Sequence, residues 1–227
     1  MNKKSKRYQE LAKLVDKTTI YPIDEAVNLA KQTATLKFDA TVEAVFRLNL
    51  DPTKAEQMFR GSIVLPEGTG KTQKVLVITT TKEKEAVTAG ADLVGDKEMI
   101  TKIQGGFLDF DIIVATPEVM SELGKIGKIL GPKGLMPTAK LDTVTTDVTK
   151  AINDIRKGKI EYRVDKNGNI HVILGKVSFS EDKLKKNYQS ILSILKKIKP
   201  ATVKGAYIKN ISISTTMGPG IKVAIED

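Results

Sequence analysis

The sequence predicts two domains of different class: an α+β domain made from both ends of the chain and an α/β domain inserted between them. Strand-like segments in both terminal parts alternate apolar and polar residues, as strands of a sheet with one solvated face do. Residues 69–158 instead alternate continuous apolar strands with helices, which is typical of a parallel sheet covered by helices. Glycine and proline punctuate residues 66–70 between the two patterns, which indicates an interdomain hinge.

The expected α+β domain is discontinuous and comprises residues 1–68 and 159–227, with helices packed on a split βαβ-like sheet. The inserted domain comprises residues 69–158 and is expected to be a Rossmann-like three-layer unit. The main elements expected in the first domain are strands near 42–49, 160–174 and 208–225 and helices near 24–34 and 180–198.

The N-terminal part begins with two predicted helices. Tyr8, Leu11, Leu14 and Val15 form an i, i+3, i+4 apolar stripe, which indicates an amphipathic helix within residues 2–17. Asp24 is expected to cap a second helix that runs to about Ala34, because an aspartate oxygen can accept from the first unpaired backbone amides.

A long strand over residues 38–50 follows these helices. Its alternation leaves two choices open, since either Val45 or Phe46, and either Leu48 or Leu50, can face the core. A short helix near 54–58 and a short strand at 62–65 complete this part.

The inserted part is predicted from the order of its apolar segments. Its expected elements are strands at 74–80 and 110–115, a short apolar segment at 91–94, and helices at 83–89, 97–104, 147–157 and from Pro117 onward.

The C-terminal part starts with a predicted β-hairpin. Residues 160–164 and 170–174 are rich in Ile, Val and Tyr, and the Asp165–Gly168 segment between them tolerates positive φ angles. Ser180 then caps a charged helix whose buried face carries Leu184, Tyr188, Ile191, Leu192 and Leu195, and Pro200 ends it. Two strands at 208–214 and 221–225 close the chain, joined by residues 215–220.

Charge and composition favour a polyanionic partner. The 227 residues include 37 Lys and Arg against 27 Asp and Glu, a formal net charge of +10, and the last third from residue 160 carries 12 of the basic and 6 of the acidic side chains. The absence of cysteine excludes disulfides, thiolate metal sites and cysteine nucleophiles. No apolar run approaches about 20 residues, and no signal-peptide core follows the basic N-terminus, so we expect a cytoplasmic protein without membrane contact.

Motifs for catalysis are weak or broken. The stretch 68–72 resembles a phosphate-binding loop, but Leu65 stands where its first glycine is required and a strand follows Lys71 instead of a helix. His171 is the only histidine, which rules out multi-histidine metal sites, and no glycine-rich dinucleotide fingerprint opens the first βα unit. We therefore expect no catalytic residues, cofactor or metal; the alternative is a nucleotide- or small-molecule-binding enzyme that uses the central α/β domain.

The segment Lys125–Pro137 (KIGKILGPKGLMP) contains three glycines and three lysines. Such a loop can let the backbone approach phosphates closely, and a helix C-cap followed by a turn explains the same residues equally well.

Four motifs, in this order along the chain, resemble the bacterial ribosomal protein L-one family from end to end. They are Lys37-Phe38-Asp39, GKIGKILGPKGLMP at 124–137, IEYRVDKNGNI at 160–170 and TTMGP at 215–219. Gly220 departs from the family pattern, where a serine is expected, so a hydroxyl contact is in doubt there.

The resemblance implies a two-domain component of the mobile stalk of the large ribosomal subunit, monomeric outside the ribosome. Its implied partners are large-subunit (23S) ribosomal RNA, deacylated tRNA leaving the exit site, and its own operon messenger RNA, whose translation it would repress. A second alternative is an RNA-binding regulator that acts outside the ribosome. Carried over by position, the implied RNA-binding residues are Lys37, Phe38, Thr41, Glu43, Arg163, Asp165, Lys166, Gly168, His171, Thr215, Thr216, Met217, Gly218, Pro219 and Gly220.

Overall fold

The structure is a computed structural model that describes residues 5–225. The chain divides into two compact units. One is formed by both chain ends, up to Gly70 and from Ile160 onward, and the other by Lys71–Lys159. Each unit has buried apolar clusters of its own, so each is described by itself.

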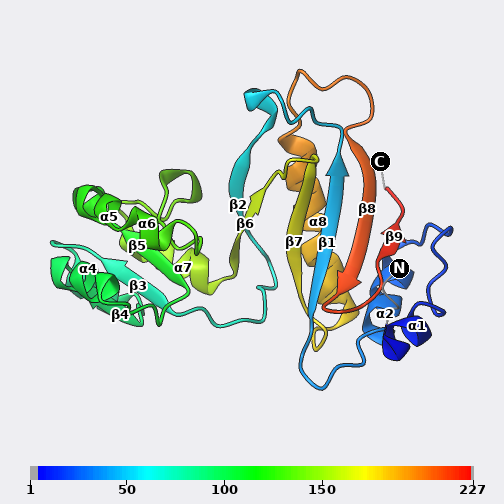
Figure 1. Ribbon diagram of the computed structural model, residues 1–227, viewed down its shortest axis with the longest axis horizontal. Coiled ribbons are helices and arrows are strands. Elements are labelled where there is room, and N and C mark those ends of the chain that lie inside the picture. The colour runs from blue at the N-terminus through cyan, green and yellow to red at the C-terminus, as the bar shows by residue number, and fades with distance from the viewer. Residues whose placement is uncertain (1–4, 226–227) are drawn as a thin grey trace. The chain divides into compact units, whose positions relative to one another are not determined.

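A four-stranded antiparallel sheet forms the centre of the first unit. Its strand order is β7 (Asn169–Lys176), β1 (Thr41–Leu48), β8 (Ile208–Thr215) and β9 (Ile221–Val223). Helices α2 (Ile23–Gln32) and α8 (Glu181–Lys197) both pack on one face of this sheet (Figure 1). The sheet therefore has one covered face and one open face.

Strand β1 shows why the sheet has these two faces. Val42, Ala44, Phe46 and Leu48 point into the core, and the residues between them are partly or fully exposed. The sequence left Val45 and Phe46 as alternatives, and the structure selects Phe46, which stacks on Tyr188 of α8 with ring centroids 5.9 Å apart. Full burial of such a ring contributes about 2–3 kcal/mol.

The hairpin predicted around residues 165–168 is wrong in its pairing. The turn exists, but only Val164 and Ile170 bridge across it. Strand β6 (Lys159–Arg163) pairs instead with β2 (Arg60–Val64) in a separate two-stranded sheet, while β7 pairs with β1 over seven residue pairs. The turn residues determine where the chain reverses, whereas the partner of each strand depends on which distant strand buries its apolar face.

Helix α1 (Lys6–Leu11) is shorter than the helix predicted for 2–17, of which residues 2–4 lie outside the described part of the chain. Ser5 caps it by accepting from the Tyr8 backbone amide. Leu11 and Val15 are buried as expected, but Leu14 is 53% exposed because the helix ends before it. The apolar stripe therefore does not continue as a helix face.

The start of α2 also differs from the prediction. Pro22, not Asp24, is the N-cap residue, so the helix begins with the buried Ile23. Asp24 lies in the first turn, where its charge suits the helix dipole, and its carboxylate is 2.7 Å from the Lys185 ammonium of α8.

Helix α8 agrees with the sequence. Ser180 caps it by accepting from the Lys183 amide, and the five predicted apolar residues are buried. Its buried Asn187 donates to the Gly68 and Leu174 carbonyl oxygens and accepts from the Glu67 amide. Residues 67–68, expected to be part of a hinge, are therefore held against the first unit.

The second unit has a parallel three-stranded sheet in the order β4 (Leu93–Gly95), β3 (Val75–Ile78) and β5 (Ile112–Ala115). Helices α3 (Glu83–Thr88) and α7 (Val148–Arg156) pack on one face. Helices α4 (Lys97–Gln104), α5 (Met120–Lys125) and α6 (Gly127–Leu130) pack on the other. This three-layer arrangement is the one that the alternating strands and helices predict.

Short 3-10 turns complete the chain at Ala55–Gln57, Pro117–Val119 and Ala139–Leu141. Within residues 5–225, no helix has the length and apolar character needed to cross a membrane.

Candidate nucleic-acid-binding surface

The open face of the four-stranded sheet carries a group of polar side chains that the first unit can offer to a partner. The β1 register sets Glu43 opposite Ile173 of β7 and Ser214 of β8, and the next row sets Val45 opposite His171 and Ser212. Cross-strand neighbours on one face lie about 4.5–5.5 Å apart at Cβ, so a carboxylate, two serine hydroxyls and an imidazole share one surface.

Glu43 is exposed and forms no hydrogen bond or ion pair with another side chain in the described part of the chain. On a chain of net charge +10, a free carboxylate at the centre of a sheet face does not serve general attraction of a polyanion. It can accept a hydrogen bond from a 2′-hydroxyl or an exocyclic amine. Glu43 therefore suits selective recognition.

One end of this face is built from the start of β1 and the turn after β8. The Thr41 amide donates to the Thr216 hydroxyl at 3.1 Å, and the Thr216 amide donates back to the Thr41 carbonyl at 3.0 Å. Lys176 of β7 donates to the Thr41 hydroxyl at 3.0 Å. These bonds hold the three strand ends together and leave the following turn projecting from them.

The turn Thr215–Gly218 carries an exposed apolar residue in an unfavourable backbone conformation. The Gly218 amide donates to the Thr215 carbonyl at 2.8 Å, and Met217 has a φ of 62°. Positive φ is uncommon outside glycine and costs about 1–2 kcal/mol. Met217 is nevertheless 68% exposed, so core packing does not account for its presence. Such strain is typical of a functional position.

The rest of this turn is shaped by close packing. Thr215 is buried, and a Cβ on Gly218 would overlap the Thr215 hydroxyl, so a larger residue at 218 would force the buried Thr215 side chain to move. Pro219 is buried and Gly220 is exposed with open space around it. Thr215 and Pro219, both predicted to bind RNA, therefore have packing roles in the turn.

Lys37 and Phe38 are exposed just before β1, and the Phe38 ring is 57% exposed. Asp39 anchors this segment by accepting from the Ser178 hydroxyl at 2.7 Å, a bond that holds the pKa of the Asp39 carboxyl below its usual range. The aromatic ring is thus available at the same end of the sheet as Thr41.

The turn at residues 165–168 lies at the other end of β1, where the Leu48 amide donates to the Gly168 carbonyl. Asp165 accepts from the Asn167 amide at 2.8 Å and from the Asn169 amide at 2.7 Å. Burial alone raises the pKa of the Asp165 carboxyl, but the bonds from Asn169 and Asn167 outweigh it and hold that pKa below its usual range.

Gly168 is buried with a φ of 78°, and an added Cβ would lie 3.2 Å from the Leu48 carbonyl oxygen. Asp165 and Gly168 were both predicted to bind RNA. Their roles in forming the turn account for both residue types without a ligand. Lys166 and Arg163 are exposed and, with Met58, line a pocket of about 380 Å³. His171 connects this end to the open face, since its Nε2 is 3.7 Å from the Asp165 carboxylate.

The structure thus separates the predicted residues into two groups, one around Thr41 and Met217 and one around Lys166, with Glu43 and His171 on the face between them. Sequence reasoning missed Ser212, Ser214 and Arg47, which share this face. Alternation along β8 could have indicated the two serines, but the register that sets them beside β1 was not readable. It also missed Arg7 of α1, which bonds the Met217 carbonyl across 210 residues.

The second unit contains the lysine of the incomplete phosphate loop and the glycine- and lysine-rich segment. Lys71, the lysine of the incomplete phosphate loop, is bound 2.6 Å from the Asp111 carboxylate. Within residues 5–225, no group of acidic or histidine side chains could hold a metal ion. The glycine- and lysine-rich segment 125–137 forms the end of α5, helix α6 and the turns after it, with Lys125, Lys128 and Lys133 exposed.

Fold and surface together define a basic α+β protein with an open polar sheet face and a parallel-sheet unit inserted in its chain. A model of the Ribosomal protein L1p/L10e family matches residues 30–219. The chain belongs to this family, and the resemblance read from its motifs is confirmed.

Curated relatives carry the name large ribosomal subunit protein uL1. The protein of Mesoplasma florum is 63% identical over 226 residues, covering 99% of this chain and 100% of the relative. Those of Mycoplasma capricolum subsp. capricolum and Mycoplasma mycoides subsp. mycoides are 61% and 60% identical, each covering 98% of this chain and 99% of the relative. The family consists of ribosomal proteins and not enzymes, so the enzyme alternative for the central domain is discarded.

Proposed function

We propose that the protein is a structural component of the large ribosomal subunit in the cytoplasm, where it binds 23S ribosomal RNA through the open sheet face and the two turns at its ends. The observation that carries this proposal is the free Glu43 carboxylate amid serine hydroxyls on an uncovered sheet face. A folded RNA presents 2′-hydroxyls and backbone along a wide, shallow groove, which such a face can contact by shape and hydrogen bonding.

The residues divide between two tasks in this proposal. Glu43, Thr216 and Met217 contact sugars and groove surface and provide selectivity, while Lys166 and Arg163 are attracted to phosphates without regard to sequence. Lys37 and Phe38 extend the first group, because a ring that is 57% exposed can stack on a base or pack against a ribose.

The same surface is proposed to bind two further RNAs, on the grounds of family membership and the basic surplus. These are deacylated tRNA leaving the exit site and the protein's own operon messenger RNA, whose translation it represses. A regulator that acts only outside the ribosome is the competing reading, and co-sedimentation with 50S particles distinguishes the two.

We also propose that residues 1–68 and 159–227 form the RNA-binding domain and that residues 69–158 form a separate inserted domain. A chain in which residues 1–68 are joined by a short linker to residues 160–227 is expected to fold and to retain most of the RNA affinity. A folded but inactive product would move the main binding site to the inserted unit.

Glu43→Gln provides a sharp test, because the two explanations of this surface predict opposite signs. If attraction is only electrostatic, removing a negative charge strengthens binding to every RNA. If Glu43 accepts a hydrogen bond, affinity for the 23S stalk fragment falls by about tenfold, because the glutamine amide oxygen still accepts but lacks the charge that strengthens the bond. Filter binding with the cognate fragment and a scrambled RNA measures both.

Glu25→Gln is the matched control, because Glu25 is an exposed carboxylate on α2, over the covered face of the sheet. It is expected to leave the ratio of cognate to scrambled affinity unchanged. Tighter binding of both RNAs by Glu43→Gln would overturn the assignment of Glu43.

A further inference from the structure

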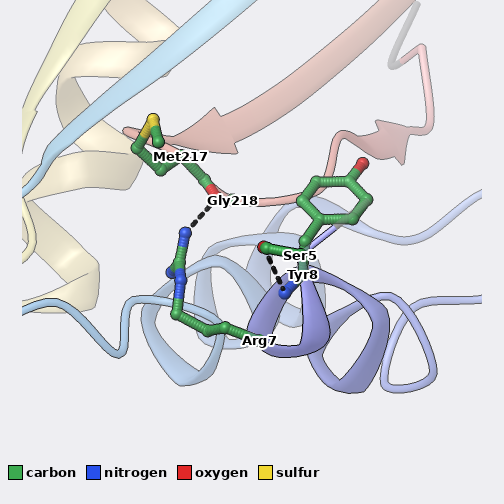
Figure 2. Close-up of a pocket in the computed structure, with 5 residues that line it drawn as sticks. All are labelled: Ser5, Arg7, Tyr8, Met217 and Gly218. Carbon is green, nitrogen blue, oxygen red and sulfur yellow. Dashed lines mark hydrogen bonds between the residues drawn. The ribbon is translucent and has the colours of Figure 1, made fainter. Parts of the chain in front are cut away.

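Helix α1 reaches the turn that presents Met217. The Arg7 guanidinium donates from Nη2 to the Met217 carbonyl oxygen at 3.0 Å, and Figure 2 shows the side chain rising from the helix toward that oxygen. Ser5, Arg7 and Tyr8 line a pocket of about 330 Å³ together with Met217 and Gly218. An element from the start of the chain thus meets the loop before the last strand.

The carbonyl that Arg7 binds belongs to the residue in the strained conformation. Met217 has a φ of 62°, which a non-glycine residue keeps only where its surroundings hold it. On one side, the Thr216 amide is bonded to Thr41 of β1, and the Gly218 amide closes the turn on Thr215. The Met217 carbonyl has Arg7 as its partner, so this bond fixes the peptide that follows the strained residue.

The guanidinium is poorly placed to meet a phosphate directly. Arg7 is only partly exposed, its Nη1 is buried without a hydrogen-bond partner in the described part of the chain, and its Nη2 is engaged with Met217. Its neighbour Lys6 is exposed on the same helix and carries the same charge. Substituting each cation in turn therefore distinguishes the effect of the contact with the turn from the effect of general electrostatic attraction to RNA.

We propose that Arg7 is a positioning residue, which holds the Thr215–Gly218 turn in the conformation that presents the Met217 side chain to RNA. This inference rests on the proposed function, in which Met217 contacts RNA. In this proposal, α1 contributes to RNA binding by holding the turn, and the charge of Arg7 does not contact the RNA directly. A charged donor on a backbone carbonyl is among the stronger hydrogen bonds, which suits it to hold a strained turn.

The first test uses the free protein and hydrogen exchange followed by NMR. In Arg7→Ala, the Gly218 amide is expected to exchange about tenfold faster, because the turn bond to Thr215 opens more often. The Thr216 amide is an internal reference, since its partner is Thr41 in β1 and its rate is expected to stay within about twofold. Lys6→Ala is the matched control and leaves both rates unchanged. Unchanged Gly218 exchange in Arg7→Ala would overturn the proposal.

The second test is a double-mutant cycle on affinity for the 23S stalk fragment. Arg7→Ala alone is expected to cost about tenfold without changing the slope of log affinity against log salt. In the Met217→Ala background, the same change is expected to cost less than about twofold, because there is no side chain left to present. Additive losses with a lower salt slope mean that Arg7 binds a phosphate itself, which contradicts positioning.

The two tests fail separately. If the wild-type protein does not prefer the cognate fragment over scrambled RNA, the proposed function fails, and the exchange rates still decide whether Arg7 holds the turn. If Met217→Ala loses cognate affinity and Arg7→Ala does not, the proposed function stands and the positioning role is wrong.

Discussion

The two turns at opposite ends of the central sheet are built in different ways. The turn at 165–168 has glycine at its positive-φ position, and Asp165 satisfies the amides of Asn167 and Asn169. The turn at 215–218 has Met217 at its positive-φ position, with the side chain exposed and an arginine from another element on its carbonyl.

The difference distinguishes residues that the fold of a turn requires from residues whose presence is explained by contact with a partner. Asp165 and Gly168 are the residues that a stable turn requires, so their chemistry is explained without a ligand. Met217 makes its turn less stable than glycine would, so its presence needs an explanation outside the turn. The exposed Lys166 lies between these cases, since neither the turn nor the core requires it.

The largest expected effect is on stability, from Gly168→Ala. A Cβ at a φ of 78° and 3.2 Å from the Leu48 carbonyl oxygen is expected to lower the free energy of unfolding by roughly 2 kcal/mol, about 4–8 °C in melting temperature. Calorimetry measures the shift. Gly220→Ala, in open space, is the control and is expected to change the free energy by less than about 0.5 kcal/mol. Equal shifts in the two variants would mean that the turn is not constrained as described.

Met217→Gly tests the other turn, where stability and affinity are expected to change in opposite directions. Relief of the positive φ, less the added entropy of glycine in the unfolded chain, is expected to raise the free energy of unfolding by about 0.5 kcal/mol. Affinity for the cognate RNA is expected to fall about tenfold and that for scrambled RNA to change little. Chemical denaturation and filter binding measure the two quantities.

Met217→Ala is the companion variant, because it removes the side chain without relieving the backbone. It is expected to lose the affinity and gain no stability. If Met217→Gly and Met217→Ala both destabilise the protein and weaken both RNAs equally, Met217 is a packing residue and the contrast between the turns disappears.

Asp165→Asn is expected to lower the free energy of unfolding by about 1 kcal/mol, and the size of this loss depends on pH. The folded-state pKa of Asp165 lies below the unfolded value of 3.8, so the charged carboxylate adds stability above that pH. This contribution is lost as the pH falls through the lowered folded-state pKa. The difference between wild type and variant in urea denaturation is therefore expected to be present at about pH 6 and to shrink toward about pH 3. A difference that is independent of pH would show that the charge does not stabilise the turn.

The smallest expected effect is that of Lys166→Ala, about two- to threefold on cognate and scrambled RNA alike. If the ammonium neutralises one phosphate, the slope of log affinity against log salt falls by about 0.7–0.9. A salt series for both RNAs measures the slope. Lys197→Ala, an exposed lysine of α8, is the control. If Lys166→Ala weakened binding of the cognate RNA alone, the turn at 165–168 would have the selective role that is assigned to the turn at 215–218.

Much of the fold was predictable because the signals are local. The alternation in β1, the Ser180 cap and the buried face of α8 each depend on residues a few positions apart, and all of them appear in the structure. The Pro22 start of α2 was missed because Asp24, a residue type favoured at the N-cap, lies two residues later, and the burial of Ile23 places the start of the helix before it. The sequence motifs could indicate which segments form the candidate surface, but not how those segments lie against one another.

Only the tertiary structure decided which segments meet. The partners of β6 and β7 depend on where β1 and β2 bury their apolar faces, so a correctly predicted turn still led to the wrong hairpin. The register that sets Glu43 beside Ser214 depends on cross-strand packing, because a shift of one residue would turn every side chain to the other face. Arg7 and Met217 lie 210 residues apart, and their contact follows from the packing of the complete first unit.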